Sequence, residues 1–235
     1  MAAIYLIRHG QASFGKADYD QLSAKGYKQA KLLGKHWQFM PMFEQVYAGD
    51  LLRHGQTLEG FIEGYQSEER PLTTHSSNLH SAILHSGLNE LNHVELLKNY
   101  NAQCENFADM SASIGNQPNA NKRLKKEFTC ALERWACGKH NHDYQETWPQ
   151  FKQRCISALQ DIISQELAVK DKRNNIENIG VFTSAGVISV ITQYVLGLSD
   201  QKTLALSQQL RNTSITKLLY SANGLTIDYF NNYSH

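Results

Sequence analysis

Three segments of the sequence place arginine, histidine or hydroxyl side chains directly after short apolar runs. Arg8 and His9 follow the first run, Arg53 lies just beyond the second, and Ser184 follows a third near residue 180. Guanidinium groups form paired hydrogen bonds with phosphate oxygens, and the free amides at a helix start favour an anion. A neutral imidazole nitrogen can attack phosphorus and form a covalent intermediate. Brought together, these residue types suit the transfer of a phosphoryl group.

Apolar runs and turn signals predict the elements that position these side chains. Strands are expected at residues 4–7, 45–48, 81–84 and 179–183, with a final hairpin of residues 213–220 and 225–230 around an Asn223-Gly224 turn. Helices are expected from the cap Ser23 to Pro41, over residues 53–65, through Leu124 and Trp135, from the cap Thr147 to Leu167, and from Ser184 to near Gly197. This alternation implies an α/β fold, a three-layer α/β/α sandwich with a mostly parallel central sheet. Ligands bind beyond the carboxyl ends of such strands, where the three segments lie.

Residues 92–150 are expected to form a helical insertion within a single domain that spans residues 1–235. A helix is expected over residues 92–113. Residues 115–121, with Gly115 and Pro118, carry the strongest loop signal of the chain.

The composition limits the classes of function. The chain has 23 basic and 22 acidic residues and a net charge of +1, which argues against the basic face that nucleic-acid binding needs. No window approaches the roughly 20 apolar residues of a membrane-spanning helix. The first apolar run lacks a basic start and ends at Arg8, so no secretory signal is expected. We therefore expect a cytoplasmic protein with no membrane or nucleic-acid partner, and the sequence does not indicate its oligomeric state.

The four cysteines are expected to be reduced thiols, because they lack CxxC pairing and no secretion signal precedes them. The cluster of Cys137, His140, His142 and Asp143 leaves a zinc site open as an alternative, since thiolate and imidazole are preferred zinc ligands. It completes no recognised ligand spacing, and we favour a polar helix end with no metal.

The order of the motifs resembles that of the histidine phosphatase superfamily, also called phosphoglycerate-mutase-like proteins. The motifs are Ile4-Tyr-Leu-Ile-Arg8-His9-Gly10-Gln11, Tyr19-Asp20-Gln-Leu22-Ser23-Ala-Lys-Gly26-Tyr-Lys-Gln29-Ala30, Asp50-Leu-Leu-Arg53-His-Gly-Gln56-Thr57, Leu88-Asn89-Glu90 and Glu146-Thr-Trp-Pro-Gln-Phe151-Lys-Gln-Arg154. The first two together are the most specific. The resemblance runs from Ile4 to about Leu219, and it is weakest over residues 92–145.

The resemblance implies a phosphatase that acts on a small phosphorylated metabolite through a phosphohistidine on His9. Arg8 and Arg53 would bind the phosphoryl oxygens, and Glu90 would be the general acid, with Glu95 nearby as another carboxylate. Residues expected at the substrate are Gln11, Ser184 and Ala185. No cofactor is implied. A phosphoglycerate-mutase-type transferase is a less favoured alternative.

Ser184 departs from the family pattern, because members have a second histidine in this turn. One hypothesis is therefore a phosphate-binding protein with impaired catalysis, since loss of one preorganised donor costs about a hundred- to thousandfold in rate. Another is a rearranged site in which the hydroxyl of Ser184 has a part of its own. The sequence assigns no role to His54, His85 or His93.

Overall fold

The computed structural model describes residues 2–13, 20–67, 79, 81–104, 107–115, 119–170, 178–221 and 224–235. Within these ranges the strands are β1 (Ala2–Arg8), β2 (Gln45–Ala48), β3 (Ile83–Leu84), β4 (Asn178–Thr183), β5 (Ile215–Ser221) and β6 (Gly224–Asn232). The helices are α1 (Ala24–Trp37), α2 (Leu52–Tyr65), α3 (His93–Tyr100), α4 (Phe107–Ile114), α5 (Ala120–Ala136), α6 (Trp148–Lys170), α7 (Ala185–Leu196) and α8 (Asp200–Ser207), with short 3-10 turns η2 (Ser86–Leu88) and η3 (Asn141–Asp143).

The described strands form one six-stranded sheet in the order β3-β2-β4-β1-β5-β6. The strands β3, β2, β4 and β1 run parallel, and β5 and β6 join antiparallel at one side. The predicted mostly parallel sheet is therefore confirmed. Because β1 lies beside β4 in parallel register, with Arg8 opposite Thr183, their carboxyl ends meet at the same edge.

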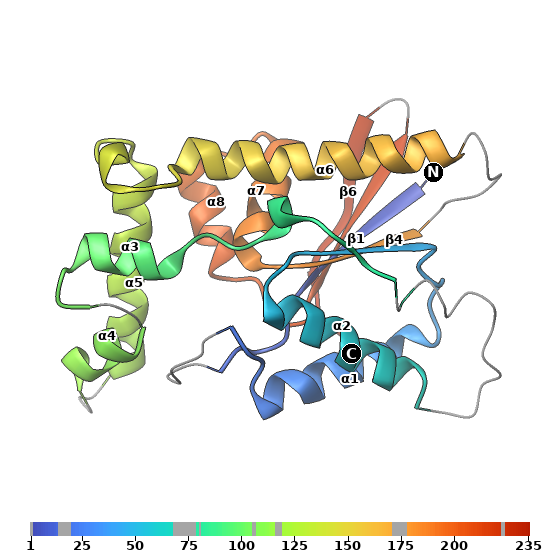
Figure 1. The fold of residues 1–235 in the computed structure, drawn as a ribbon, viewed down its shortest axis with the longest axis horizontal. Coiled ribbons are helices and arrows are strands. Elements are labelled where there is room, and N and C mark those ends of the chain that lie inside the picture. The colour runs from blue at the N-terminus through green and yellow to red at the C-terminus, as the bar shows by residue number, and fades with distance from the viewer. Residues whose placement is uncertain are drawn as a thin grey trace.

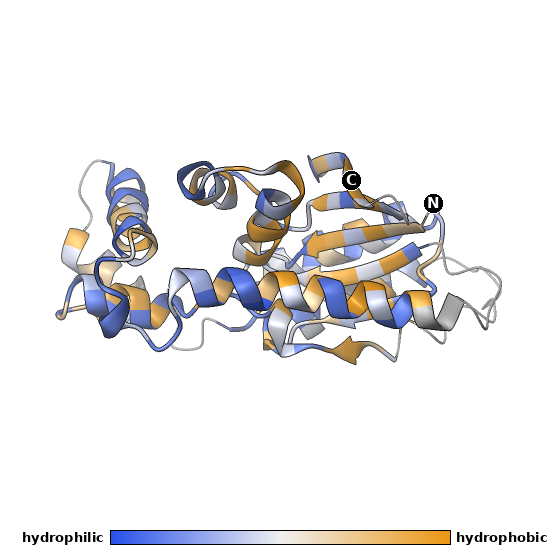
Figure 2. Ribbon diagram, turned by 90° about the horizontal axis from the view of Figure 1, so that it is seen from above, coloured by the Kyte–Doolittle hydropathy of each residue, from blue (hydrophilic) through white to orange (hydrophobic). Residues whose placement is uncertain are grey.

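Alternate residues of the central strand β1 enter two separate cores, which makes the molecule three layers deep. Ile4 and Leu6 belong to a core shared with α6 and α7, whereas Tyr5 and Ile7 belong to a core shared with α1 and α2. Figure 1 shows α6 along one face of the sheet and the pair α1 and α2 on the other. In Figure 2 the strands are mainly hydrophobic, while hydrophilic and hydrophobic residues alternate along α6, which lies across them. The predicted α/β/α sandwich is confirmed.

The helices α1 and α2 cross at very short range. A Cβ built on Gly34 of α1 would lie 2.0 Å from the carbonyl oxygen of Phe61, and one on Gly64 of α2 would lie 2.0 Å from that of Lys31. Only glycine permits this approach of two backbones. The crossing fixes α2, whose first turn carries Arg53, against α1, whose predicted cap is confirmed by a 3.1 Å bond from the Gly26 amide to Ser23 Oγ.

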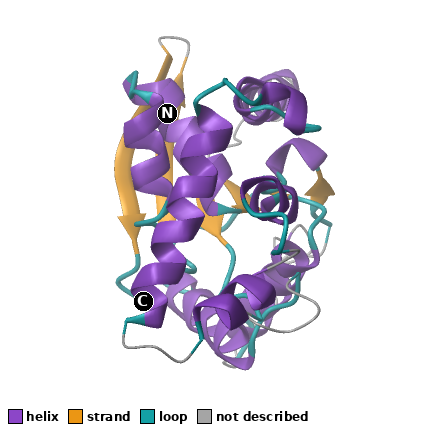
Figure 3. Ribbon diagram, turned by 90° about the vertical axis from the view of Figure 1, so that its left-hand side faces the viewer, coloured by secondary structure: helices purple, strands orange, loops and turns teal. Residues whose placement is uncertain are grey.

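The helices α3, α4 and α5 pack together at one end of the molecule (Figures 1 and 3). They enclose a small core of their own that includes Leu97, Met110 and Ala131. The single helix predicted over residues 92–113 is wrong, because α3 ends before Asn101 and α4 begins at Phe107. The side-chain oxygen of Asn101 accepts from the amide of Gln103 at 3.1 Å. This local hydrogen bond competes with the helical backbone hydrogen bonds, and α3 does not continue.

Some elements differ from the predictions, and some predicted residues lie outside the part of the chain that the structure describes. Helix α8 was not predicted, and α5 begins at Ala120, inside the loop expected over residues 115–121. Residue 223 of the expected hairpin turn and residues 116–118 of the expected loop lie outside the described residues. Within the described part of the chain, none of the helices combines the length and apolar character that a bilayer span requires.

Candidate active site

A cavity of about 330 Å³ opens beyond the carboxyl ends of β1 and β4. Its polar lining is Arg8, His9, Arg53, Glu90 and His93, with Lys125, Ser207 and Gln208 completing the polar groups. Its apolar lining is Leu91, Phe128, Leu132 and Ala185, together with Gly186. The strand ends, the first turn of α2 and the start of α7 thus contribute to one space, as the sheet topology requires.

His9 sits at the end of β1 in a loop held from several sides. Its amide donates to the carbonyl of Thr183 at 2.9 Å, and the Asn212 side chain donates to the His9 carbonyl at 3.1 Å. The Nδ1 atom lies 2.7 Å from the carbonyl oxygen of Gly10. Because a carbonyl only accepts, Nδ1 carries the proton, and Nε2 of the neutral ring retains its lone pair.

The electrostatic surroundings keep this ring neutral. Burial of the imidazole, followed by the positive charges of Arg53 and Arg8, holds the pKa of His9 well below its usual range. A neutral imidazole with a fixed tautomer is the form that can act as a nucleophile.

The two guanidinium groups reach the cavity from different elements. Arg53 lies on the first turn of α2 with its side chain 4% exposed, and its NH1 donates to Oδ1 of Asp20 at 2.6 Å. The second oxygen of Asp20 accepts from the amide of Leu52 at 2.8 Å, at the start of the same helix. The Arg8 guanidinium donates to the carbonyl of Leu210. Both arginines line the cavity together with His9.

The carboxylate of Glu90 lies at the start of α7. Its Oε2 accepts from the amide of Gly186 at 3.1 Å, and its Oε1 accepts from the amide of Leu91 at 3.1 Å. The first amides of a helix and its dipole favour such an anion. Glu90 lines the cavity itself, next to Ala185 and Gly186 of the first turn of α7.

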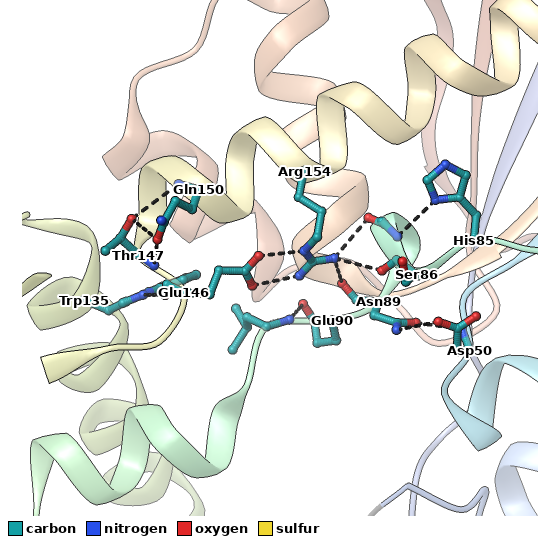
Figure 4. Close-up of polar contacts among 12 residues, drawn as sticks. Asp50, His85, Ser86, Asn89, Glu90, Trp135, Glu146, Thr147, Gln150 and Arg154 are labelled. Carbon is teal, nitrogen blue, oxygen red and sulfur yellow. Dashed lines mark hydrogen bonds and ion pairs between the residues drawn. The ribbon is translucent and has the colours of Figure 1, made fainter. Parts of the chain in front are cut away.

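Arg154 of α6 ties down the loop that carries Glu90 (Figure 4). Its Nε and NH2 donate to Glu146 at 2.6 and 2.9 Å, while NH1 donates to the carbonyl oxygens of Ser86, Gly87 and Asn89 at 3.2, 3.1 and 2.9 Å. The Asn89 side chain in turn accepts from the amide of Asp50 at 2.7 Å. The Arg154 guanidinium thus connects α6 to the loop of Glu90, and the Asn89 side chain connects that loop to the turn after β2.

Comparison with known proteins identifies the family. A family model described as the histidine phosphatase superfamily (branch 1) matches residues 4–77 and 109–233. The chain belongs to the histidine phosphatase superfamily. None of the curated proteins searched matches the sequence.

Solved structures of superfamily members have the same fold at low sequence identity. A phosphoglycerate mutase from Bacillus anthracis str. Sterne is 18% identical with a TM-score of 0.61, covering 99% of this chain and 94% of its own. A mycobacterial glucosyl-3-phosphoglycerate phosphatase in complex with VO3 is 17% identical with a TM-score of 0.63, covering 98% and 99%. A phosphoserine phosphatase from Entamoeba histolytica, in complex with phosphoserine, is 16% identical with a TM-score of 0.58, covering 100% and 98%.

The structure brings together most, but not all, of the residues that the sequence singled out. Arg8, His9, Arg53, Glu90 and Ala185 line one cavity. Gln11 is not in the lining, and its amide donates to the side chain of Gln29 at 2.9 Å. Ser184 is fully buried and also lies outside the lining. Glu90 falls between the two segments that the histidine phosphatase model matches, so its place rests on the structure alone.

The alternative zinc cluster forms ion pairs instead. Asp143 pairs with Arg134 and, at 3.1 Å, with His142. Among the described residues, which include this whole cluster, no group of three or more histidine, cysteine, aspartate or glutamate side chains could hold a metal ion.

Two histidines of the site were not assigned from the sequence. His93 lines the cavity, and burial together with Arg53 lowers its pKa to about 4. His54 is fully buried, with its ring centroid 5.9 Å from that of His9. Its position directly after Arg53, on the first turn of the helix, is the signal that could have found it.

Proposed function

We propose that this superfamily member is a phosphomonoester hydrolase that works through a phosphohistidine on His9. The observation that carries the proposal is a neutral imidazole, fixed through Nδ1 by the Gly10 carbonyl, in one cavity with two guanidinium groups. Arg8 and Arg53 supply planar hydrogen-bond donors for the oxygens of the transferring phosphoryl group, and their positive charges complement its negative charge. Phosphoryl transfer requires a nucleophile and groups that stabilise the charge of the transition state; here these are His9 and the two arginines.

The reaction has two steps that share His9 and Glu90. The first step requires Glu90 in its protonated form. The Nε2 lone pair of His9 attacks phosphorus, the P–N bond forms, and the P–O bond to the leaving group breaks as the carboxyl of Glu90 gives that oxygen its proton and becomes a carboxylate. In the second, water attacks phosphorus and gives a proton to Glu90, and the P–N bond breaks with its electron pair returning to His9. For the first step, one oxygen of Glu90 would turn from its backbone amide toward the leaving oxygen.

The lining of the cavity favours a small phosphorylated metabolite whose organic part has some apolar surface. The volume of about 330 Å³ lies at the lower end of the range for small-molecule sites. Leu91, Phe128 and Leu132 supply apolar lining for the organic part of such a substrate, and Lys125 and Gln208 supply polar groups. The neighbouring structures named for phosphoserine and phosphoglycerate derivatives support this class of substrate. We also propose a cytoplasmic location, where thiols such as the four cysteines of this chain stay reduced.

The test is incubation with a panel of phosphorylated metabolites, measuring release of inorganic phosphate and the mass of His9-containing peptides. Turnover together with a phosphate adduct on His9 supports the proposal. Binding of phosphate without turnover would instead indicate a binding protein, and isomerisation that depends on a bisphosphate primer would indicate a mutase.

His9→Ala is the decisive variant. It should reduce turnover to background, because no other group in the mechanism can form the covalent intermediate. Its thermal midpoint should stay close to that of the wild type, and inorganic phosphate should still bind through Arg8 and Arg53. Turnover retained in this variant would refute the phosphohistidine mechanism.

A further inference from the structure

His54 and Ser184 form a buried hydrogen-bonded pair beside the site. His54 Nε2 lies 2.7 Å from Ser184 Oγ, and both residues have 0% exposure. They are 130 residues apart in the chain and come from two elements that line the cavity, the first turn of α2 and the start of α7. The His54 ring also lies near the ring of His9, at a centroid distance of 5.9 Å.

The structure around the pair is built to hold an imidazole. A Cβ on Gly49 would lie 2.4 Å from His54 Nδ1, so any side chain at position 49 would displace the ring. Burial lowers the pKa of His54 to about 3, with Arg53 acting in the same direction. The ring is therefore neutral, and it adds no positive charge to a site that already contains two arginines.

The hydroxyl of Ser184 is used for this pair and not for capping. Ser184 is the N-cap residue of α7, a position where serine side chains accept from the helix amides, yet its side chain makes no cap bond. The carboxylate of Glu90 accepts from the Gly186 amide in its place. The pair and the carboxylate thus fix the start of α7 from two sides.

We propose that His54 is a positioning residue of the active site, which through Ser184 fixes the turn before α7 and, by contact, the ring of His9. The inference rests on the proposed function for its catalytic consequence, but the positioning itself is a property of the folded protein. It implies that positions 54 and 184 are coupled: the His54 ring fills the space beside residue 184, which must then be small.

The variants that test this are His54→Ala, His54→Gln, Ser184→Ala, Ser184→His and the double variant His54→Ala/Ser184→His, with the exposed His142→Ala as control. The readouts are kcat and KM on an aryl phosphate and the ¹⁵N imidazole signals of His9. Loss of the pair would displace the imidazole of His9. A displacement of about 1 Å in an active site can lower the reaction rate about a hundredfold. We expect His54→Ala to lower kcat by about ten- to hundredfold with little change in KM, and His54→Gln, whose amide can still bond Ser184, to recover part of it.

The exchange gives the sharper result. Ser184→His alone should lose activity, because its ring would meet that of His54. In the double variant the space is free, and kcat should exceed that of Ser184→His by at least about tenfold, a coupling that independent sites do not show. Equal kcat in both, or a His54→Ala enzyme within twofold of the wild type, would overturn the proposal.

The NMR readout separates this inference from the proposed function. If the wild type shows no turnover of any ester, the proposed function fails, but the His9 signals still report positioning. A shift of these signals in His54→Ala and Ser184→Ala, and not in His142→Ala, supports the pair. Unchanged His9 signals in both variants would refute it. If His54→Ala fails to fold, Ser184→Ala, which also removes the hydrogen bond, gives the same test alone.

Discussion

The imidazole of His9 is buried beside two guanidinium groups, and both features lower its pKa below 6.5. The nucleophile therefore stays neutral in a pH range where an exposed histidine becomes charged. The rate of phosphohistidine formation at saturating substrate should stay constant as the pH falls through 6.5. Rapid-quench measurement of the adduct between pH 8 and pH 5.5 checks this. A decline with a midpoint near 6.5 would mean that the ring is solvated during catalysis.

At this scale the sequence predicted that Arg8, His9 and Arg53 lie together in the candidate site, because they are adjacent to strand ends that the sheet brings together. The role of His54 could not be predicted, because its partner Ser184 lies 130 residues away and neither residue alone indicates the pair. The burial of Ser184 was equally hidden, since it depends on the ring that fills the neighbouring space. Motifs reveal residues that act locally, and pairs such as this one require the fold.

At the scale of elements, the crossing of α1 and α2 positions Arg53. Gly34→Ala should lower the free energy of unfolding by about 2 kcal/mol, since its methyl group would meet the Phe61 carbonyl and overpacking costs about 1–3 kcal/mol. Gly55→Ala on α2 is the matched control, because its Cβ would meet nothing within 4 Å. The control should be neutral or stabilising, by up to about 1 kcal/mol from helix propensity. Urea unfolding measures the free energy of unfolding of both variants. Equal values for Gly34→Ala and Gly55→Ala would contradict the close crossing of α1 and α2.

The loop of Glu90 depends on α6 through one side chain. Arg154→Met keeps the apolar stem but removes the donors to three loop carbonyls and to Glu146. We expect kcat to fall by about tenfold or more, because Glu90 would no longer be held beside α7, while the affinity for inorganic phosphate changes little. Steady-state kinetics and phosphate titration measure the two effects. Equal losses in both would show that Arg154 supports the whole site and not the acid.

The elements themselves were predicted unevenly. Strands and the helices that cover them follow from apolar periodicity, and their positions are confirmed. The apolar pattern of residues 92–113 predicts one continuous helix. In the structure α3 ends before Asn101, whose side-chain oxygen accepts from the amide of Gln103. Such competition between a side chain and the helical backbone leaves no trace in the pattern of apolar residues.

For the whole molecule, buried histidines make stability depend on pH. Burial lowers the pKa of His54 to about 3 and those of His93 and His235 to about 4, and that of His9 lies well below 6.5. Between these values and 6.5 the unfolded chain binds protons that the folded protein does not, so stability falls as the pH falls. Each such histidine contributes a slope of about 1.4 kcal/mol per pH unit.

His54→Asn should remove one of these contributions. Its free energy of unfolding should fall less steeply than that of the wild type between pH 6.5 and pH 4.5, by about 1.4 kcal/mol per pH unit, even if it is less stable at pH 7. Urea unfolding at several pH values gives the slopes. The exposed His142→Asn should retain the wild-type slope, and a wild-type slope in His54→Asn would mean that His54 is not buried in the neutral form.

The place of β1 in the sheet also governs when the protein can begin to work. Tyr5 of β1 donates to Asn178, 173 residues further along the chain, and Arg8 donates its amide to Ser214. At ribosomal rates of about 5–20 residues per second, β1 waits on the order of ten to thirty seconds for β4, the first strand in sequence that pairs with it. Tyr5 and Ile7 can pack earlier against α1 and α2, but Ile4 and Leu6 belong to the core that needs α6 and α7. His9 is made long before Thr183, to whose carbonyl its amide donates, so the pocket around the imidazole closes only after β4 and α7 have left the ribosome.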